Sequence, residues 1–214
     1  MKKIQPVRAP NLPLPPDEYS RSYLDQLTNA LRLYFTRRDS NESSLFDKSG
    51  GQFLSNPYVQ VSSNLGQQTL DNTPVNVKWS SVDFANQFSL KSQAEIEFGV
   101  AGMWRVEYEM LCFNSDSSPH TLFTWLKLNG KDVEKSAREF YLDESSGWMA
   151  RGSCIIETKE KDLLSLSWTA DKCGYPGGLD GVYITLNPKQ TKPYVRPEVP
   201  SVLTSITFVS APQG

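Results

Sequence analysis

Large apolar side chains recur at every second position between Gly102 and Cys112, and this alternation constrains the fold more than any other feature. The apolar set is Trp104, Val106, Tyr108, Met110 and Cys112. The residues between them are Met103, Arg105, Glu107, Glu109 and Leu111. A period of two residues is typical of a β-strand with one buried face. We therefore expect a long amphipathic strand here.

A second strand and a tight turn follow. Residues Leu122 to Leu128 form another strand-like run. Asn129 and Gly130 then supply the residue pair that best tolerates the positive φ angles of a type I′ hairpin turn. A long strand, a second strand and a hairpin together predict an antiparallel β domain.

The chain from Tyr58 onward contains only short strand-like runs separated by turn residues. Such spacing predicts a mainly β sandwich or barrel of about ten strands. The expected strands are 58–62, 74–79, 94–98, 102–113, 121–128, 138–142, 148–158, 163–169, 181–186 and 202–210.

The first 16 residues are rich in proline, which blocks helix formation and favours an extended arm. Leu12 and Leu14 place apolar side chains on this arm. The arm is suited to lying in a groove of another protein. A flexible leader is an equally weighted alternative.

Residues Asp17 to Arg38 predict one amphipathic helix. Its apolar stripe contains Leu24, Leu27, Leu31 and Tyr34 at helical spacing. The head domain, sister helices or a docking protein could cover this stripe. We favour either sister helices or a docking protein, acting together with the arm. The predicted organisation is an arm and anchoring helix over 1–38, a linker over 39–57 and a head domain over 58–214.

Composition excludes several classes of protein. The 22 basic and 24 acidic residues give a net charge of −2, so we expect no nucleic acid or anionic membrane as a partner. The sequence has no apolar run of about 18 residues and no secretory signal, so we expect no membrane insertion. We expect a soluble protein made in the cytosol.

No group of residues predicts catalysis. The single histidine, His120, lies in a polar loop and is expected to be solvated. The acidic loop residues are expected to be solvated as well, and these are Asp116, Asp143, Glu144, Asp171 and Asp180. The glycine-rich segment 174–181 lacks the ending of a P-loop. We therefore expect no enzyme activity, no cofactor and no metal.

The three cysteines form neither an even set nor a CxxC pair, so a structural zinc site is not expected. Cys112 and Cys154 fall on the apolar faces of their strands, where a free cysteine acts as a small apolar residue. A disulfide between them is the alternative. The third cysteine is Cys173.

Phe123 and Trp125 lie on the face of their strand opposite Leu122, Leu126 and Leu128. Exposed aromatic side chains often mark an interface. We predict that Phe123 and Trp125 line a subunit contact. The alternative is that a loop, such as the long segment 174–200, folds over them.

The order of these motifs resembles the jelly-roll head shared by tumour necrosis factor and the complement globular heads. The segments that carry the resemblance are 58–61, 82–86, 96–98, 102–109, 125–130 and 161–168. It covers about residues 58 to 210 and departs from the family between Ala170 and Val202, where a Gly-, Pro- and Asn-rich insertion replaces a short loop. The resemblance implies an antiparallel jelly roll that assembles as a homotrimer.

The leader from Pro10 to Phe35 resembles the N-terminal leader of small structural proteins of tailed bacteriophages, notably marine podoviruses. This resemblance implies a virion component made in the host cytoplasm. Its arm and helix would attach to capsid, portal or tail proteins while the trimeric head serves as a fibre, a decoration or a tail component. The alternative is an adhesin whose head binds a host receptor or glycan.

Overall fold

The computed structural model describes residues 10–14, 18, 20–46, 56–175, 178–187, 190–191 and 193–211. The chain divides into two compact units, Met1–Asn56 and Pro57–Gly214. Most of the predicted proline arm lies outside the described residues, and so does the part of the predicted linker from residue 47 to residue 55.

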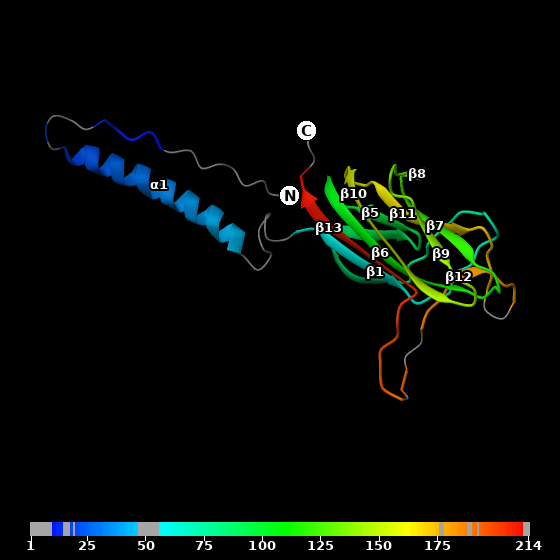
Figure 1. Ribbon diagram of the computed structural model, residues 1–214. Coiled ribbons are helices and arrows are strands. Elements are labelled where there is room, and N and C mark those ends of the chain that lie inside the picture. The colour runs from blue at the N-terminus through cyan, green and yellow to red at the C-terminus, as the bar shows by residue number, and fades with distance from the viewer. Residues whose placement is uncertain are drawn as a thin grey trace. The chain divides into compact units, whose positions relative to one another are not determined.

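The first unit contains the helix α1 (Arg21–Phe46) (Figure 1). It begins later than the predicted start at Asp17, because Ser20 takes the capping position. The Ser20 hydroxyl oxygen accepts a hydrogen bond from the Tyr23 N–H at 3.4 Å. The helix also continues eight residues beyond Arg38, since the sequence from Asp39 to Phe46 contains neither glycine nor proline to end it.

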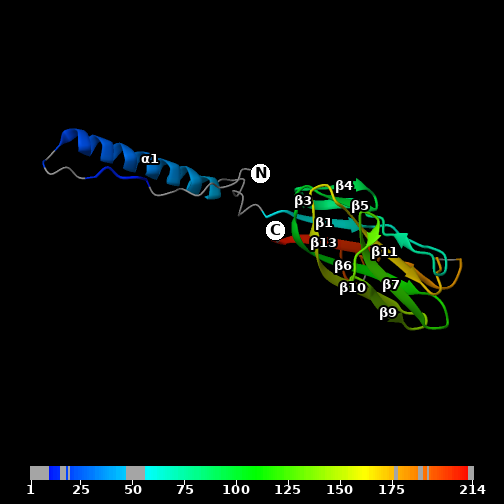
Figure 2. The ribbon, with the colours of Figure 1, turned by 90° about the horizontal axis from the view of Figure 1, so that it is seen from above.

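The second unit is a sandwich of two antiparallel sheets, here called sheet A and sheet B. Sheet A contains, in spatial order, β10 (Gly147–Thr158), β6 (Gly102–Asn114), β13 (Val202–Ser210), β1 (Tyr58–Ser63) and β3 (Ser81–Asn86), with β12 (Val182–Ile184) also paired to β6. Figure 2 shows β1, β13, β6 and β10 side by side in this order.

Sheet B packs against sheet A. It contains, in spatial order, β4 (Phe88–Ser92), β5 (Glu95–Phe98), β11 (Leu163–Ala170), β7 (His120–Leu128) and β8 (Lys131–Asp132), with β2 (Val75–Asn76) beside β11 and β9 (Arg138–Leu142) beside β7.

The strand order is that of a jelly roll, because the chain passes repeatedly from one sheet to the other. It runs from β5 in sheet B to β6 in sheet A, returns through β7 and β9, and alternates again through β10, β11 and β13. The prediction of a mainly β antiparallel jelly roll preceded by one helix is confirmed.

Every predicted strand is present, and the described residues contain three further strands that were not predicted, β3, β4 and β8. The chain passes from β3 in sheet A to β4 in sheet B at Gln87, which has a positive φ of 65°. The alternation of apolar and polar side chains does not reveal this positive φ angle, so the sequence did not predict β3 and β4. The run predicted over 74–79 pairs only at Val75–Asn76, while Val77 and Trp79 beyond it are fully buried.

The core forms between the inward side chains of β6 and β11. Trp104 of β6 lies in a cluster of aromatic rings that also includes Phe88, Phe98 and Phe208, with centroid separations from Trp104 of 4.9 to 5.3 Å. The alternation within 148–158 groups Trp148 with the inward residues Ala150 and Ile156, but its side chain is 53% exposed. It lies near the start of β10, which is an edge strand, so little structure covers it.

A buried polar contact between β6 and β7 crosses this core. The Tyr108 hydroxyl of β6 lies 2.6 Å from the Thr124 hydroxyl of β7, so the two sheets share a buried hydrogen bond. Gly152 of β10 pairs directly with Tyr108. A β-carbon at this position would overlap the Tyr108 ring. The absence of a side chain at Gly152 therefore provides the space that the Tyr108 ring fills.

We expect Gly152→Ala to destabilise the head by about 1–3 kcal/mol, because overpacking a filled site forces neighbouring side chains to move. Chemical denaturation of the purified protein measures this free energy of unfolding. Gly147→Ala is a matched control on the same strand, since its β-carbon would meet the Phe113 ring at an ordinary 3.5 Å. Equal stability of both variants would contradict the proposed role of Gly152.

Candidate functional site

His120 lies at the first position of β7 and links two carboxylates. Its Nε2 is 3.0 Å from Asp116 Oδ2, and its Nδ1 is 3.2 Å from Asp171 Oδ1. Its side chain is only 12% exposed. The expectation of a solvated loop histidine was therefore wrong. The contacts that bury it come from two separate loops, which local sequence does not bring together.

Asp116 is the centre of this cluster. Its carboxylate also accepts a hydrogen bond from Lys172, and its side chain is 11% exposed. The hydrogen bonds from Lys172 and then from His120 hold the pKa of Asp116 well below its ordinary value. Asp116 is thus not the solvated carboxylate that we expected, whereas Asp171 remains 46% exposed.

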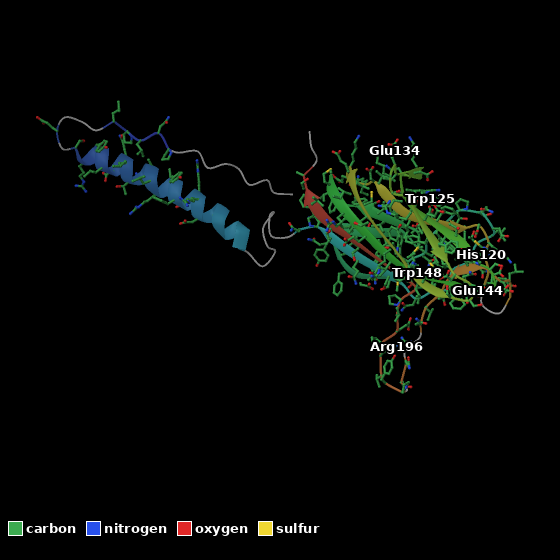
Figure 3. All side chains as sticks on the ribbon, viewed as in Figure 1. His120, Trp125, Glu134, Glu144, Trp148 and Arg196 are labelled. Atoms are coloured by element: carbon green, nitrogen blue, oxygen red, sulfur yellow. The ribbon has the colours of Figure 1, made fainter. Side chains whose placement is uncertain are left out.

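The cluster joins the loops at one end of the sandwich. Asp116 follows β6, His120 begins β7, and Lys172 follows β11. Asn114 extends the same network, because its side-chain oxygen accepts a hydrogen bond from the Asp116 N–H at 3.0 Å and its amide group donates to the carbonyl oxygen of Asp143 at 3.0 Å. Figure 3 shows His120 at this end of the head. We call the group of Asp116, His120, Asp171 and Lys172 the loop clasp.

The geometry of the loop clasp favours a structural role. Both ring nitrogens of His120 face carboxylates, so neither is directed at a hydroxyl or thiol nucleophile. Lys172 also places its cation beside Asp116. Among the described residues, no group of three or more His, Cys, Asp or Glu side chains is placed to hold a metal ion.

The cysteines are free thiols. In the paired strands β6 and β10, Cys112 lies opposite Trp148 and Cys154 opposite Val106. Six residues along a strand separate the two positions by roughly 20 Å, which excludes the alternative of a disulfide between Cys112 and Cys154. Burial raises the pKa of the Cys112 thiol to about 12, so it is unreactive at neutral pH.

The predicted anchor residues remain accessible. Leu12, Leu14 and Leu24 are exposed, while Leu27, Leu31 and Tyr34 are half-buried. Two further apolar side chains of α1, Leu33 and Phe35, are exposed. Among the helix side chains described, through Ser40, none is buried. The predicted role of these residues in attachment stays a prediction.

Phe123 and Trp125 lie on the outer face of sheet B, as their alternation predicted. Phe123 is exposed and Trp125 is half-buried. The described residues between Asn187 and Val199 do not fold over them. These residues form a hairpin with bridges between Asn187 and Val199 and between Gln190 and Arg196, and Figure 3 shows Arg196 projecting well away from Trp125.

Tyr141 of β9 shares this outer face and was not identified from the sequence. Strand β9 pairs with β7 so that Tyr141 lies opposite Thr121 and Glu139 opposite Phe123. The alternation within 138–142 predicted a strand, but the neighbour of that strand depends on the topology. We call Phe123, Trp125 and Tyr141 the aromatic row.

A hollow of about 530 Å³ lies beside Gly152. Two acidic and two basic side chains line it, and these are Glu107, Glu109, Arg138 and Arg151. Arg151 Nε pairs with Glu109 at 3.1 Å, and Arg138 donates to the carbonyl oxygen of Ser153 at 2.9 Å. The charges are balanced, so the hollow does not select an anion or a cation.

No family model matches this chain, and no curated protein matches it. Among solved structures, it is similar to the globular domain of a zebrafish complement 1qA protein, with 12% identity and a TM-score of 0.45. The likeness covers 73% of this chain and 99% of that one. The strand order described above defines the fold independently of this likeness. Within the described residues, no helix combines the length and apolar composition that a membrane crossing requires.

Asp116→Asn tests the loop clasp. Because the folded-state pKa of Asp116 lies below the ordinary value of about 3.9, its stabilisation is present above that pH and is lost as the pH falls below it. We expect the variant to have a lower Tm at pH 7 and a smaller loss of Tm between pH 7 and pH 3.

Asp143→Asn is the matched control, because Asp143 is exposed and its side chain makes no contact with the clasp in the described structure. It should keep the Tm and its pH dependence unchanged. Identical pH dependence in Asp116→Asn and the wild-type protein would show that the clasp does not depend on the Asp116 charge.

Proposed function

We propose that this chain is a non-enzymatic structural protein of a tailed-bacteriophage virion, made in the host cytoplasm. The arm and α1 attach it to a capsid, portal or tail protein, and the jelly-roll head is displayed as a fibre, a decoration or a tail component. The observation that carries this proposal is the apolar side of α1, where Leu24 and Phe35 are exposed beside the half-buried Leu27 and Leu31. The resemblance of the leader to phage structural proteins adds to it.

The helix surface needs a partner. An amphipathic helix of this kind is stabilised mainly by burying its apolar side against other elements. Its half-buried stripe contains Tyr23, Leu27, Leu31 and Tyr34. A groove on another virion protein, or sister helices of the same assembly, would bury this stripe.

We further propose that the head is a homotrimer. Apolar side chains are exposed on sheet A, in β1, β3, β10 and β13, and these are Tyr58, Phe84, Ile155 and Val209. A contiguous exposed apolar patch often marks an interface. Tyr58 and Phe84 are neighbours on adjacent strands, because Gln60 pairs with Phe84. A subunit contact on sheet A would bury them. The predicted contact at Phe123 and Trp125 on sheet B is the rival position.

Light scattering tests the homotrimer. Three copies of the 24.1 kDa chain give a particle of about 72 kDa. Phe84→Glu should dissociate this particle, because it places a charge in the proposed contact on sheet A. Phe123→Glu is the matched comparison on sheet B. A trimer that dissociates only with Phe123→Glu would place the contact on sheet B, and a wild-type monomer would refute the trimer.

Particle incorporation tests the anchor. Leu27→Asp combined with Leu31→Asp should reduce the copies per particle at least about tenfold, because removing central apolar contacts from an interface costs more than 1.4 kcal/mol. Asn29→Asp is the control, since Asn29 is exposed on the same helix. Normal incorporation of a protein lacking residues 1–38 would refute attachment through this unit.

A second candidate function is recognition of the host surface by the head. The observation that favours it is the aromatic row on the outer face of sheet B. In this function, the head is still displayed on the particle, but sheet B contacts a host receptor or glycan.

A further inference from the structure

We propose that the aromatic row is a carbohydrate-binding site for an oligosaccharide of neutral or amino sugars. The site comprises Phe123 and Trp125 of β7 and Tyr141 of β9, with Glu139 and Thr121 as neighbouring polar groups. This inference deepens the second candidate function and rests on it. It does not depend on how the protein is attached to a particle.

The strand register places the three rings in a line. Phe123 and Trp125 are two residues apart on β7, so their side chains share one face at a spacing of about 7 Å. Tyr141 pairs with Thr121 and therefore lies diagonal to Phe123, at roughly 7–8 Å. The row extends across two strands over roughly 14 Å. This length suits an oligosaccharide better than a single sugar.

The Trp125 ring is held in place by its own chain. Its indole N–H donates to Asp132 Oδ1 at 2.8 Å, and Lys127 Nζ lies 5.7 Å from the ring centroid. Lys127 Nζ is also 3.9 Å from Asp132 Oδ1. The hairpin turn at Asn129 and Gly130 fixes these groups. A ligand that stacks on the row therefore loses little affinity to side-chain ordering.

Polar side chains flank the aromatic row on both sides of Phe123. Glu139 lies directly opposite Phe123 on one side, and Thr169 lies opposite Phe123 on the other. Among the described residues, the outward positions of β7 and β9 carry no aliphatic side chain. A protein interface has a continuous apolar centre that is depleted in charge. A sugar instead presents C–H groups to aromatic rings and hydroxyl groups to carboxylates.

Lys127 is paired with Asp132 at 3.9 Å, so among the described residues Glu139 carries the unpaired charge beside the aromatic row. Its side chain is exposed and forms no ion pair with another described residue. A free carboxylate accepts hydrogen bonds from hydroxyl, amide or ammonium groups and repels another anion. This charge complementarity favours neutral or amino sugars over sialylated or phosphorylated ones.

Calorimetric titration of the full-length protein with chitohexaose, maltohexaose and a sialylated oligosaccharide tests the site. We expect binding of a neutral or amino-sugar probe and none of the sialylated one. Phe123→Ala and Tyr141→Ala should each weaken binding at least about tenfold, since each removes a stacking surface. Phe123→Tyr keeps a ring and should restore binding to within about threefold.

Tyr194→Ala is the matched control for Tyr141→Ala. Tyr194 is 63% exposed and Tyr141 is 64% exposed, but Tyr194 lies on the projecting hairpin. Its substitution should leave sugar binding unchanged. Circular dichroism of each variant shows whether the fold is intact.

Three results would overturn the proposal. The first is no binding of any of the three oligosaccharides at millimolar concentration. The second is dissociation of an oligomer by Phe123→Ala or Tyr141→Ala, which would make the row a subunit contact. The third is adsorption to host cells that requires the row but survives enzymatic removal of surface glycans. The third result would leave host recognition intact and identify a protein receptor.

Discussion

Strand β6 is the constraint on which the rest of the head depends. It runs for 13 residues and pairs with β10 on one side and with β13 and β12 on the other. Its inward side chains form the centre of the core, and its outward side chains include Glu107 and Glu109. A shift of one residue would bury these carboxylates and expose Trp104 and Tyr108, at a cost of several kcal/mol for each charge. This penalty fixes the register of sheet A.

The register of β6 also determines what sheet B displays. The Tyr108 hydroxyl meets Thr124 across the core, so the inward face of β7 is set by β6. Phe123 and Trp125, on either side of Thr124, must then point outward. At the end of the same strand, the loop clasp holds His120 between Asp116 and Asp171. Stability therefore depends on the interior and the loop end, and the outer faces are free to bind partners.

The alternation of apolar and polar residues predicted most strands of the head. Each long strand has one buried face, so its apolar residues recur at every second position. The alternation also placed Phe123 and Trp125 on the outer face of sheet B. The alternation did not predict burial correctly where contacts between distant parts of the chain determine whether a side chain is exposed. Trp148 follows the alternation of β10 but is exposed because β10 is an edge strand. His120 contacts Asp116, four residues before it, and also Asp171 from the loop after β11, which local sequence does not bring near. Tyr141 joined the aromatic row only through the pairing of β9 with β7, which no local period reveals.

The proposed functions use separate surfaces and are therefore compatible. The stripe of α1 would be used for attachment, sheet A for self-association and the aromatic row on sheet B for a glycan. A trimer would present three aromatic rows on one rigid body. Single sugar contacts are weak, but three sites that engage one surface together gain from effective concentration, which can raise avidity by about 10²–10⁴. Self-association through sheet A would thus convert a weak site on sheet B into a strong attachment to a glycan-covered surface.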